Sequence, residues 1–325
     1  MDNILILDTS IASLNRGDSI IMECTRKELA PLLQDNFELT LPTHISPFHW
    51  YQVWRKSLRV MTYANCKYKF VGGSNILIPD LRTHFPQWNI NIFNYQPLKG
   101  CVLVGVGAGA GAEGPLNWYT KYIYSHLLNR QFYHSARDER SKEYMERLGL
   151  KAIDTGCVTM WMLTPEFCAT IPHGKADKVV FTLNAQQKSV LSDQQIIDTL
   201  VSNYKEICFW PQCLGDYEYL HQFHNIEGIH ILQATKEAYD EFLTNNDTDY
   251  VGTRLHGGVY AMRHGRRSII IAIDERARAI NEKNHLNCID KNQIEDLPQM
   301  INSEFETKVQ MDFEAIDRWK KQFGL

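Results

Sequence analysis

The sequence Val251-Gly-Thr-Arg-Leu-His-Gly-Gly-Val259 is followed by a helix-like stretch and then by the apolar run Ser268-Ile-Ile-Ile-Ala-Ile-Asp274. A strand, a helix and a second buried strand in this order form the repeating unit of an α/β fold with a parallel sheet. Short apolar runs alternate with longer amphipathic stretches along the rest of the chain as well. The sequence therefore predicts an α/β protein with mainly parallel sheets.

Arg254 and His256 lie two positions apart, and we expect both in the extended end of the first of these strands. Side chains two apart in a strand point to the same face, so a permanent cation and a group able to donate a proton near neutral pH would lie side by side. Gly257 and Gly258 let the backbone bend closely into the next helix, whose N-terminus favours anions. The segment predicts a site for a small, acidic, proton-accepting substrate. The alternative is that His256 is a hydrogen-bonded structural histidine.

The remaining elements form two series, separated by residues 165–177, whose prolines and glycine suit a linker. In the first series the expected strands are residues 4–7, 69–71, 101–106, 131–135 and 152–154, and the expected helices are 19–33, 50–65, 117–130 and 138–148. In the second series the expected strands are 178–183, 206–210, 229–232, 250–252 and 268–273, and the expected helices are 193–203, 216–224, 235–244 and 258–264. A last amphipathic helix is expected over 313–323.

The length of the chain favours two domains. With 325 residues, 44% of them hydrophobic, it is too long for a typical single core. We expect one domain over residues 1–170, a second over 171–310, and a final helix over 311–325. Two α/β units imply a cleft between them, with ligand-binding loops at the carboxyl ends of the strands.

Composition narrows the class of protein. The formal net charge of −4 gives no basic footprint for nucleic acid or for an anionic membrane, and no apolar run approaches the roughly 20 residues of a membrane span. The first eight residues suit a buried strand and lack the signals of a secretion peptide. The eight cysteines show no Cys-x-x-Cys pair or zinc spacing and suit small core residues. We expect a cytoplasmic protein without an integral membrane segment, and leave a peripheral association with the inner membrane open.

A first glycine motif, Asn15-Arg-Gly-Asp-Ser19, follows the first strand and opens the first helix. Backbone N–H groups at such a point can hold an anion, which makes Asn15, Gly17 and Asp18 candidate ligands for an acceptor or an anion. A plain turn, with Asp18 or Ser19 as the helix cap, explains the motif equally well.

A second glycine motif, Val71-Gly-Gly-Ser-Asn75, ends a short strand. Gly72 and Gly73 let a ligand approach the backbone closely, and Ser74 and Asn75 add polar contacts. A simple turn is again the alternative.

A third motif, Gly105-Val-Gly-Ala-Gly-Ala110, fits the dinucleotide fingerprint Gly-x-Gly-x-x-Ala, and Asp138 follows the next strand as a ribose-binding acid would. The following helix, however, is expected to begin only near Asn117, after a proline. Because this gap separates the glycines from the helix N-terminus, the sequence disfavours nicotinamide or flavin binding.

Arg137 follows another strand and precedes a helix, so it is expected at the carboxyl end of the sheet, where a planar guanidinium suits carboxylate or phosphate. The alternative is that Asp138 caps the helix while Arg137 and Arg140 remain solvated.

Two further groups of residues have structural explanations. Asn246-Asp-Thr-Asp249 resembles the Asp-x-Asp metal motif of some glycosyltransferases, but helix termination and surface charge explain it better. Aromatic side chains that offer stacking faces for a sugar, although core packing is expected for most of them, are Trp50, Trp54, Trp88, Trp118 and Tyr119.

Taken in order, these segments resemble the polysaccharide pyruvyl transferase family over roughly residues 2–280. The matching pieces are residues 15–18, 72–75 and 105–109, Arg137-Asp138 with Ser141 and Gly149, Arg254-Leu-His256, and Ala261, Gly265 and the strand to Asp274. The resemblance implies a GT-B-like fold, in which two Rossmann-type domains face an interdomain cleft and the C-terminal helix crosses back to the first domain.

Members of this family transfer the carbon skeleton of phosphoenolpyruvate onto two hydroxyls of a sugar, and form a cyclic pyruvate ketal in surface polysaccharides of the bacterial type. The family's donor-binding residues match Arg137, Arg254 and His256, and Gly257 and Gly258 follow directly. We expect His256 to supply the proton that activates the donor, because an imidazole can donate one near neutral pH. Relatives often carry a lysine after the strand that ends at Asp274, and here Arg276 is the candidate substitute.

Because arginines and helix N-termini can bind phosphate and carboxylate, the resemblance implies phosphoenolpyruvate as a co-substrate, with no metal and no further cofactor. The acceptor sugar stays open as free, nucleotide-linked, lipid-linked or part of a glycan, with the first domain as its expected side. Two alternatives remain: a GT-B glycosyltransferase that uses a nucleotide sugar, and a catalytically silent binding protein of a polysaccharide pathway.

Overall fold

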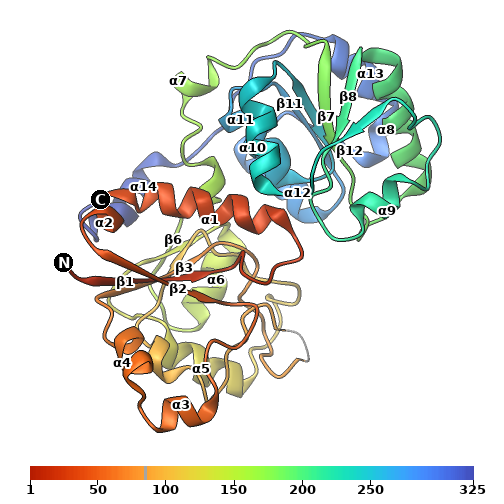
Figure 1. The fold of residues 1–325 in the computed structure, drawn as a ribbon. Coiled ribbons are helices and arrows are strands. Elements are labelled where there is room, and N and C mark those ends of the chain that lie inside the picture. Colours follow the sequence, from red (N-terminus) through yellow and green to blue (C-terminus); the bar gives the residue numbers. More distant parts are fainter. Residues whose placement is uncertain (84–85) are drawn as a thin grey trace. The chain divides into compact units, whose positions relative to one another are not determined.

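The computed structural model describes residues 1–83 and 86–325, except the side chains of Glu275 and Arg276. The chain forms two compact units, which Figure 1 shows coloured along the sequence. The first unit consists of Met1–Ser13, Ile21–Trp161 and Asp312–Leu325, and the second of Leu14–Ile20 and Met162–Met311. The expected linker lies wholly in the second unit, where residues 165–168 form a short helix capped by Thr164.

The first unit is built on a parallel sheet with the strand order β2-β1-β3-β4. A second parallel pair, β5-β6, is joined to the loop after β4 by a single bridge between Val106 and Ala136. The strands are β1 (Asn3–Asp8), β2 (Phe37–Pro42), β3 (Tyr68–Gly72), β4 (Val102–Val104), β5 (His134–Ala136) and β6 (Ala152–Asp154).

Short helices surround these strands, and most of them begin at a side-chain N-cap or at a proline in the first turn. They are α1 (Arg16–Glu28), α2 (Ala30–Gln34), α3 (Trp50–Trp54), α4 (Leu58–Ala64), η1 (Gln96–Leu98), α5 (Trp118–Leu127), α6 (Glu139–Arg147), η2 (Val158–Met160) and α14 (Phe313–Lys321). Asn117 caps α5 by accepting from the Tyr119 N–H, and Asp138 caps α6 by accepting from the Ser141 N–H. The first turn of α1 groups with the second unit and the rest with the first.

The C-terminal helix α14 completes the first unit. Trp319 is fully buried, and its ring centroid lies 5.7 Å from that of Trp161 and 6.3 Å from that of Phe70. Phe323 adds a contact of 5.0 Å to Phe70. This aromatic cluster fixes the last segment of the chain onto a sheet made by its beginning.

The second unit has one six-stranded parallel sheet with the order β12-β11-β10-β7-β8-β9. Counted within the unit, this is the order 3-2-1-4-5-6 of the Rossmann fold, whose point of reversal lies between its first and fourth strands, here β7 and β10. The strands are β7 (Lys178–Thr182), β8 (Glu206–Phe209), β9 (Ile229–Ile231), β10 (Asp249–Gly252), β11 (Ser268–Ala272) and β12 (Cys288–Asp290). The fold class is therefore α/β with parallel sheets, as the sequence predicts.

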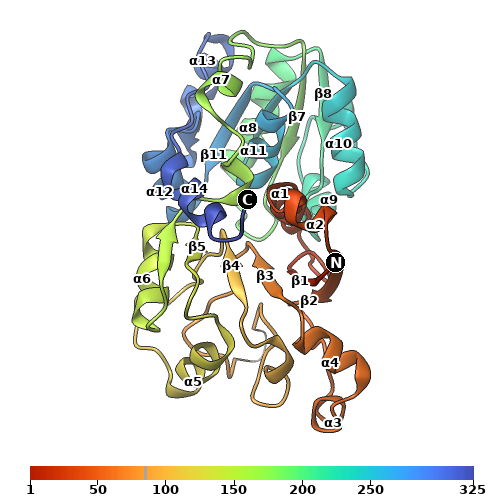
Figure 2. The same ribbon diagram turned by 90° about the vertical axis from the view of Figure 1, so that its left-hand side faces the viewer.

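Helices connect these strands on both sides, as Figure 2 shows from the second direction. They are α7 (Pro165–Cys168), α8 (Val190–Asn203), α9 (Asp216–Leu220), α10 (Lys236–Asn245), α11 (Leu255–Arg263), α12 (Glu275–Asn284), η3 (Lys291–Asp296) and α13 (Leu297–Asn302). In the described residues no helix has both the length and the apolar character needed to span a bilayer.

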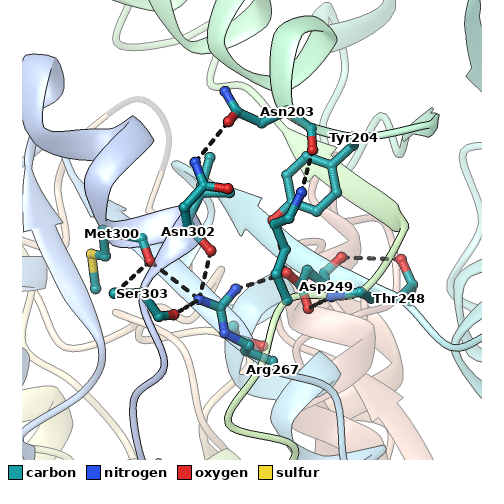
Figure 3. Close-up of polar contacts among 12 residues, drawn as sticks. Asn203, Tyr204, Thr248, Asp249, Arg267, Met300, Asn302 and Ser303 are labelled. Atoms are coloured by element: carbon teal, nitrogen blue, oxygen red, sulfur yellow. Dashed lines mark hydrogen bonds and ion pairs between the residues drawn. The ribbon is translucent and has the colours of Figure 1, made fainter.

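Arg267, at the start of β11, is the centre of a buried polar network (Figure 3). Its guanidinium donates to Asp249 Oδ2 at 2.7 Å, and to the carbonyl oxygens of Met300, Ile301 and Ser303 at 3.1, 2.9 and 2.8 Å. Tyr204 Oη also donates to Asp249 Oδ2, at 2.8 Å. The expectation of a surface charge at Asp249 is wrong, because the residue begins β10 in the middle of the sheet and pairs with Arg267.

Candidate functional site

Arg254 lies at the point of reversal of the second sheet, directly after β10. The expected strand ends at Gly252 and α11 begins at Leu255, so Arg254 is the N-cap of the helix and His256 lies in its first turn. The prediction that both side chains share one face of a strand is therefore wrong. Tyr250 Oη donates to the carbonyl oxygen of Arg254 at 2.7 Å, which holds the chain in a tight turn immediately after the strand.

The guanidinium of Arg254 is nearly buried and forms an ion pair with Asp216. Nη2 donates to Asp216 Oδ1 at 2.6 Å, and Nε donates to the carbonyl oxygen of Leu183 at 3.3 Å. Asp216 is fully buried and also accepts from the backbone N–H groups of Ala185, at 3.0 Å, and Cys213, at 2.8 Å. One carboxylate thus joins the segments that follow β7, β8 and β10.

Asp216 is absent from the residues that sequence reasoning selected. It follows Gly215 at the start of an expected helix, where acidic residues are common because they interact favourably with the helix dipole. Its partner Arg254 is 38 residues away in the chain, so no local sequence pattern predicts the pairing. The usable signal is its position, because it lies just beyond the carboxyl end of β8.

The Asn15 loop reaches the same edge of the second unit. Asn15 Oδ1 accepts from the Gly17 N–H and from Gln212 Nε2, each at 2.9 Å. Asn15 therefore caps α1, and not Asp18 or Ser19 as expected, because the helix begins at Arg16. Asp18 is buried, and its N–H donates to the carbonyl oxygen of Asn15 at 3.1 Å.

Gln212 links this loop to α11. Its Oε1 is buried without a hydrogen-bond partner among the described atoms, and a Cβ added to Gly257 would lie 3.0 Å from it. A Cβ on Gly258 would lie 2.8 Å from the ring of Tyr250. The two glycines are thus required by the close packing of Gln212 and Tyr250 against the first turn of α11.

The amino end of α11 has the electrostatic character of an anion site. Among the described side chains none caps it, and its first N–H groups carry the positive end of the helix dipole. Arg254 immediately precedes these groups, and His256, which is half-buried, lies within the first turn. Leu255 is the first residue of the helix, so the cation of Arg254 and the imidazole of His256 lie on either side of the helix start in the sequence.

A second cluster lies at the carboxyl edge of the first sheet. Arg137 is almost fully buried, and its Nη2 donates to Asn75 Oδ1 at 2.5 Å. Its Nε has no hydrogen-bond partner among the described atoms. A Cβ on Gly107 would lie 2.6 Å from the guanidinium carbon, so the glycine makes room for Arg137. The alternative of a solvated side chain is therefore wrong for Arg137, although Asp138 does cap α6.

The Gly72-Gly73-Ser74-Asn75 segment frames this second cluster. Side chains at Gly72 and Gly73 would overlap Met22 and Ile21 of α1, so these glycines serve helix packing. The carbonyl oxygen of Ser74 accepts from the Gly107 N–H at 2.9 Å. No helix begins until Trp118, so the Gly105–Ala110 motif lacks the helix that dinucleotide binding requires.

The predicted site residues therefore form two clusters, one in each unit. The second-unit cluster contains Asn15, Gly17, Asp18, Arg254, His256, Gly257 and Gly258, and the first-unit cluster contains Gly72, Gly73, Ser74, Asn75 and Arg137. Arg276 lies in the first turn of α12, and its side chain is outside the described part of the structure.

Cys213 is the cysteine nearest to these groups, since its N–H binds Asp216. Burial raises the pKa of its thiol above the ordinary value. A higher pKa reduces the thiolate fraction near neutral pH, which disfavours a thiolate nucleophile at this position.

Two solved structures share the fold of this chain. The structure of S. aureus MnaA with UDP has a TM-score of 0.52 and 10% sequence identity, and covers 98% of this chain and 94% of that chain. The UDP-GlcNAc 2-epimerase of Methanocaldococcus jannaschii, in complex with UDP-GlcNAc and UDP, has a TM-score of 0.54 and 12% identity, with 99% of each chain covered. The fold is accordingly GT-B-like.

A comparison with curated proteins gave no match to this sequence. The comparison with protein families matched polysaccharide pyruvyl transferase over residues 15–275. This span begins at the residue that caps α1 and includes both clusters of predicted site residues. The chain belongs to the polysaccharide pyruvyl transferase family.

Proposed function

We propose that this protein transfers pyruvyl from phosphoenolpyruvate to two hydroxyl groups of a sugar, and so forms a cyclic pyruvate ketal. Family membership supports pyruvyl transfer in general. The observation that supports phosphoenolpyruvate as the donor is the arrangement at the start of α11. There Arg254 and His256 flank a helix N-terminus that no described side chain caps. Phosphoenolpyruvate presents a phosphate and a carboxylate, and this arrangement supplies a cation and N–H donors for such groups.

The ion pair between Arg254 and Asp216 supports a binding role for the arginine. With Nη2 fixed on Asp216 and Nε on the Leu183 carbonyl, the plane of the guanidinium is set before any ligand arrives. A cation whose orientation is already fixed loses little further freedom on binding an anion. We therefore assign Arg254 to orientation of the donor through its remaining N–H groups.

The chemistry starts with a proton. His256 gives a proton to the methylene carbon of phosphoenolpyruvate, and the carbon that bears the phosphate becomes oxocarbenium-like. One sugar hydroxyl attacks this carbon, the C–O bond to phosphate then breaks, and inorganic phosphate leaves. The second hydroxyl adds to the same carbon and closes the ketal, and each hydroxyl releases its proton. Positioned acid catalysis of this kind typically contributes about 10²–10⁴-fold.

Arg137 and Arg276 are further donor-binding candidates, by resemblance to the family. For Arg137 the buried Nε without a partner is supporting evidence, because such a group gains a hydrogen bond when an anion binds. Substitution of each arginine by lysine tests the assignment, since lysine keeps the charge and loses the planar fork. A rise in the KM for phosphoenolpyruvate is expected for Arg137→Lys.

The acceptor is a sugar with two suitably placed hydroxyls, and its carrier is to be found by experiment. Both fold neighbours contain UDP, so nucleotide-linked sugars belong in the panel beside free, lipid-linked and glycan-bound sugars. A GT-B glycosyltransferase would instead consume a nucleotide sugar and release a nucleotide. The two functions are distinguished by the product released, which is inorganic phosphate in one and nucleotide in the other.

The test is incubation with phosphoenolpyruvate and the acceptor panel, in the presence of a chelator, with measurement of released phosphate and of acceptor mass. We expect phosphate release together with an acceptor that gains one pyruvate less one water. In folded His256→Ala and Arg254→Ala variants the rate should fall by at least about a hundredfold. Wild-type turnover in both variants would refute the assignment, and donor-independent nucleotide release would favour the glycosyltransferase.

A further inference from the structure

One end of the first unit exposes large apolar side chains next to basic ones. We call this the aromatic-basic surface and define it by Trp50, Trp54, Leu58, Phe93 and Trp118, with Arg55, Lys56 and Arg59. Trp54 is 75% exposed, Leu58 86% and Trp118 73%. Figure 1 shows the helices α3, α4 and α5 at the same end of the unit, and Phe93 lies in the loop before η1.

Hydrogen bonds connect the loop that contains Phe93 both to α5 and to the loop before α3. The Ile92 N–H, next to Phe93, donates to Tyr119 Oη on α5 at 3.0 Å. Asn94 Nδ2 donates to Ser46 Oγ at 3.0 Å, in the loop that leads into α3. Trp50 and Trp54 are separated by one helical turn, so both lie on the same face of α3.

The distribution of tryptophan over the molecule is uneven. Of the seven tryptophans in the sequence, Trp88, Trp161, Trp210 and Trp319 are buried, and all three exposed ones belong to the aromatic-basic surface. The sequence predicts core packing for most of the candidate sugar-stacking residues. Among the tryptophans of that group, Trp88 is packed in the core, whereas Trp50, Trp54 and Trp118 are exposed. An apolar patch of this kind on a soluble fold marks an interaction site.

The stretch of sequence that includes this surface is positively charged, although the whole chain is negative. Residues 39–137 contain ten lysines and arginines but only two acids, Asp80 and Glu113, whereas the complete chain has a formal charge of −4. Arg55, Lys56 and Arg59 are exposed, and within the described residues none of them pairs with a carboxylate. The net charge of the chain therefore conceals a local basic footprint, contrary to the expectation from composition.

We propose that the aromatic-basic surface docks this protein onto a bilayer that contains anionic lipid. Indole rings and leucine enter the interface between headgroups and acyl chains, while the three basic side chains contact lipid phosphates. A protein partner is less favoured, because the exposed cations Arg55, Lys56 and Arg59 lie directly beside exposed apolar side chains on two short helices, which is the mixture that suits a lipid interface. The proposal goes beyond the enzymatic function and does not depend on it.

The experiment is cosedimentation of the purified full chain with vesicles at low ionic strength. One set contains phosphatidylcholine alone, and the other equal parts of phosphatidylcholine and phosphatidylglycerol. We expect binding to the anionic vesicles, weakening as salt is added, and quenching of tryptophan emission by brominated lipid. Each basic residue near an anionic surface contributes about fivefold in affinity, so Arg55→Glu/Arg59→Glu should lower the partition coefficient by at least tenfold.

A second variant, Trp54→Ser/Leu58→Ser, tests the apolar part without disturbing the core, since both side chains are largely exposed. It should bind the anionic vesicles at least tenfold more weakly. The matched controls are Leu191→Ser, 83% exposed on α8, and Lys205→Glu, an exposed lysine of the second unit. Both controls should bind as the wild type does.

Failure of the wild type to bind anionic vesicles at low salt would overturn the proposal, as would equal binding by the two variants. Light scattering provides a further check, because a dimer that Trp54→Ser/Leu58→Ser converts to monomer would make the surface a contact between copies of the chain. Phosphate release from phosphoenolpyruvate is measured separately with soluble acceptors, so loss of docking and loss of the proposed activity are distinguishable.

Discussion

Arg254 and Arg137 are both buried, but the charges of their guanidinium groups are balanced by nearby carboxylates to different degrees. Arg254 has a carboxylate partner in Asp216, whereas Arg137 has the neutral oxygen of Asn75 close by and Asp138 Oδ2 at the longer distance of 3.5 Å. A buried cation is stabilised chiefly by a close carboxylate and full hydrogen bonding. The two residues should therefore respond differently to substitution of their neighbours.

At Asp216 we predict a large effect on stability. Asp216→Ala leaves Arg254 buried without its carboxylate, and removal of one partner of a buried ion pair typically costs about 3–5 kcal/mol. Urea denaturation measures the change in the free energy of unfolding. The double variant Asp216→Ala/Arg254→Met should recover part of the loss, and equal stability of Asp216→Ala and wild type would contradict the pairing.

At Gly107 we predict that one methyl group displaces Arg137. The Cβ of Gly107→Ala would overlap the guanidinium, and overpacking of this kind typically costs about 1–3 kcal/mol. The KM for phosphoenolpyruvate should rise as well. Gly174→Ala is the control, because no heavy atom lies within 4 Å of its added Cβ. A normal KM in a folded Gly107→Ala variant would argue against a donor-binding role for Arg137.

Residue types at strand ends were sufficient to select Arg137 and Asn75, but not to predict that they touch. Their hydrogen bond joins positions 62 apart in sequence. Asp216 was missed for the same reason, since a buried ion pair depends on tertiary packing and leaves no local periodicity. Glycine spacing likewise located a crowded backbone at Gly107 without revealing which side chain fills the space.

The junction of β10 and α11 shows how elements depart from local propensity. The sequence predicts a helix that begins at residue 258, since Gly257 and Gly258 are poor helix formers. The helix begins at Leu255 instead, because both glycines pack closely against Tyr250 within its first turn. β2 and β12 were not expected. Both lie at the edge of their sheets, and β2 has only one buried residue, Leu41, so its apolar signal is weak.

A buried histidine of β5, which accepts a hydrogen bond from β4, has a consequence for acid stability. His134 Nδ1 accepts from the Leu103 N–H at 3.1 Å, and Nε2 lies 2.7 Å from the carbonyl oxygen of Asn129, so the ring is held neutral. Burial lowers the pKa of His134 to about 4 from an ordinary 6.5. The unfolded chain therefore binds a proton more readily between these two values.

We predict that this histidine destabilises the fold as the pH falls from 6.5 toward 4, and has no effect above that window. The complete loss is roughly 3 kcal/mol, of which about 2 kcal/mol appears between pH 7 and pH 5. Urea denaturation at both pH values measures it. His134→Gln should remove this part of the pH dependence, whatever its stability at neutral pH. An unchanged pH dependence would show that other groups cause the acid sensitivity.

At the scale of the whole molecule, each unit has its own core, and the first is discontinuous in sequence. Its three segments are brought together by β1 in the middle of the sheet and by α14 on the aromatic cluster around Trp319. The alternation of strands and helices predicted the α/β class because it depends on local periodicity. It did not predict that residues 14–20 group with the second unit. That grouping depends on Gln212, whose Nε2 donates to Asn15 Oδ1 and whose carbonyl oxygen accepts from the Arg16 N–H.

We predict that Trp319→Ala lowers the free energy of unfolding of the first unit by about 3–5 kcal/mol, the usual cost of a large cavity. Near-ultraviolet circular dichroism during urea denaturation follows the aromatic cluster directly. Trp118→Ala is the matched control, and as an exposed tryptophan it should change stability by no more than about 0.5 kcal/mol. Similar behaviour of the two variants would contradict the role of α14.

The interrupted layout of the first unit has a consequence for synthesis of the chain. A ribosome makes Ile21–Trp161 before the whole of Met162–Met311, and only then Asp312–Leu325. The second unit is therefore almost complete in the nascent polypeptide while the rings of Phe70 and Trp161 still lack the indole of Trp319. During that interval the earlier-made part of the first unit exposes apolar surface to chaperones, and its folding is completed only after Trp319 has left the ribosome.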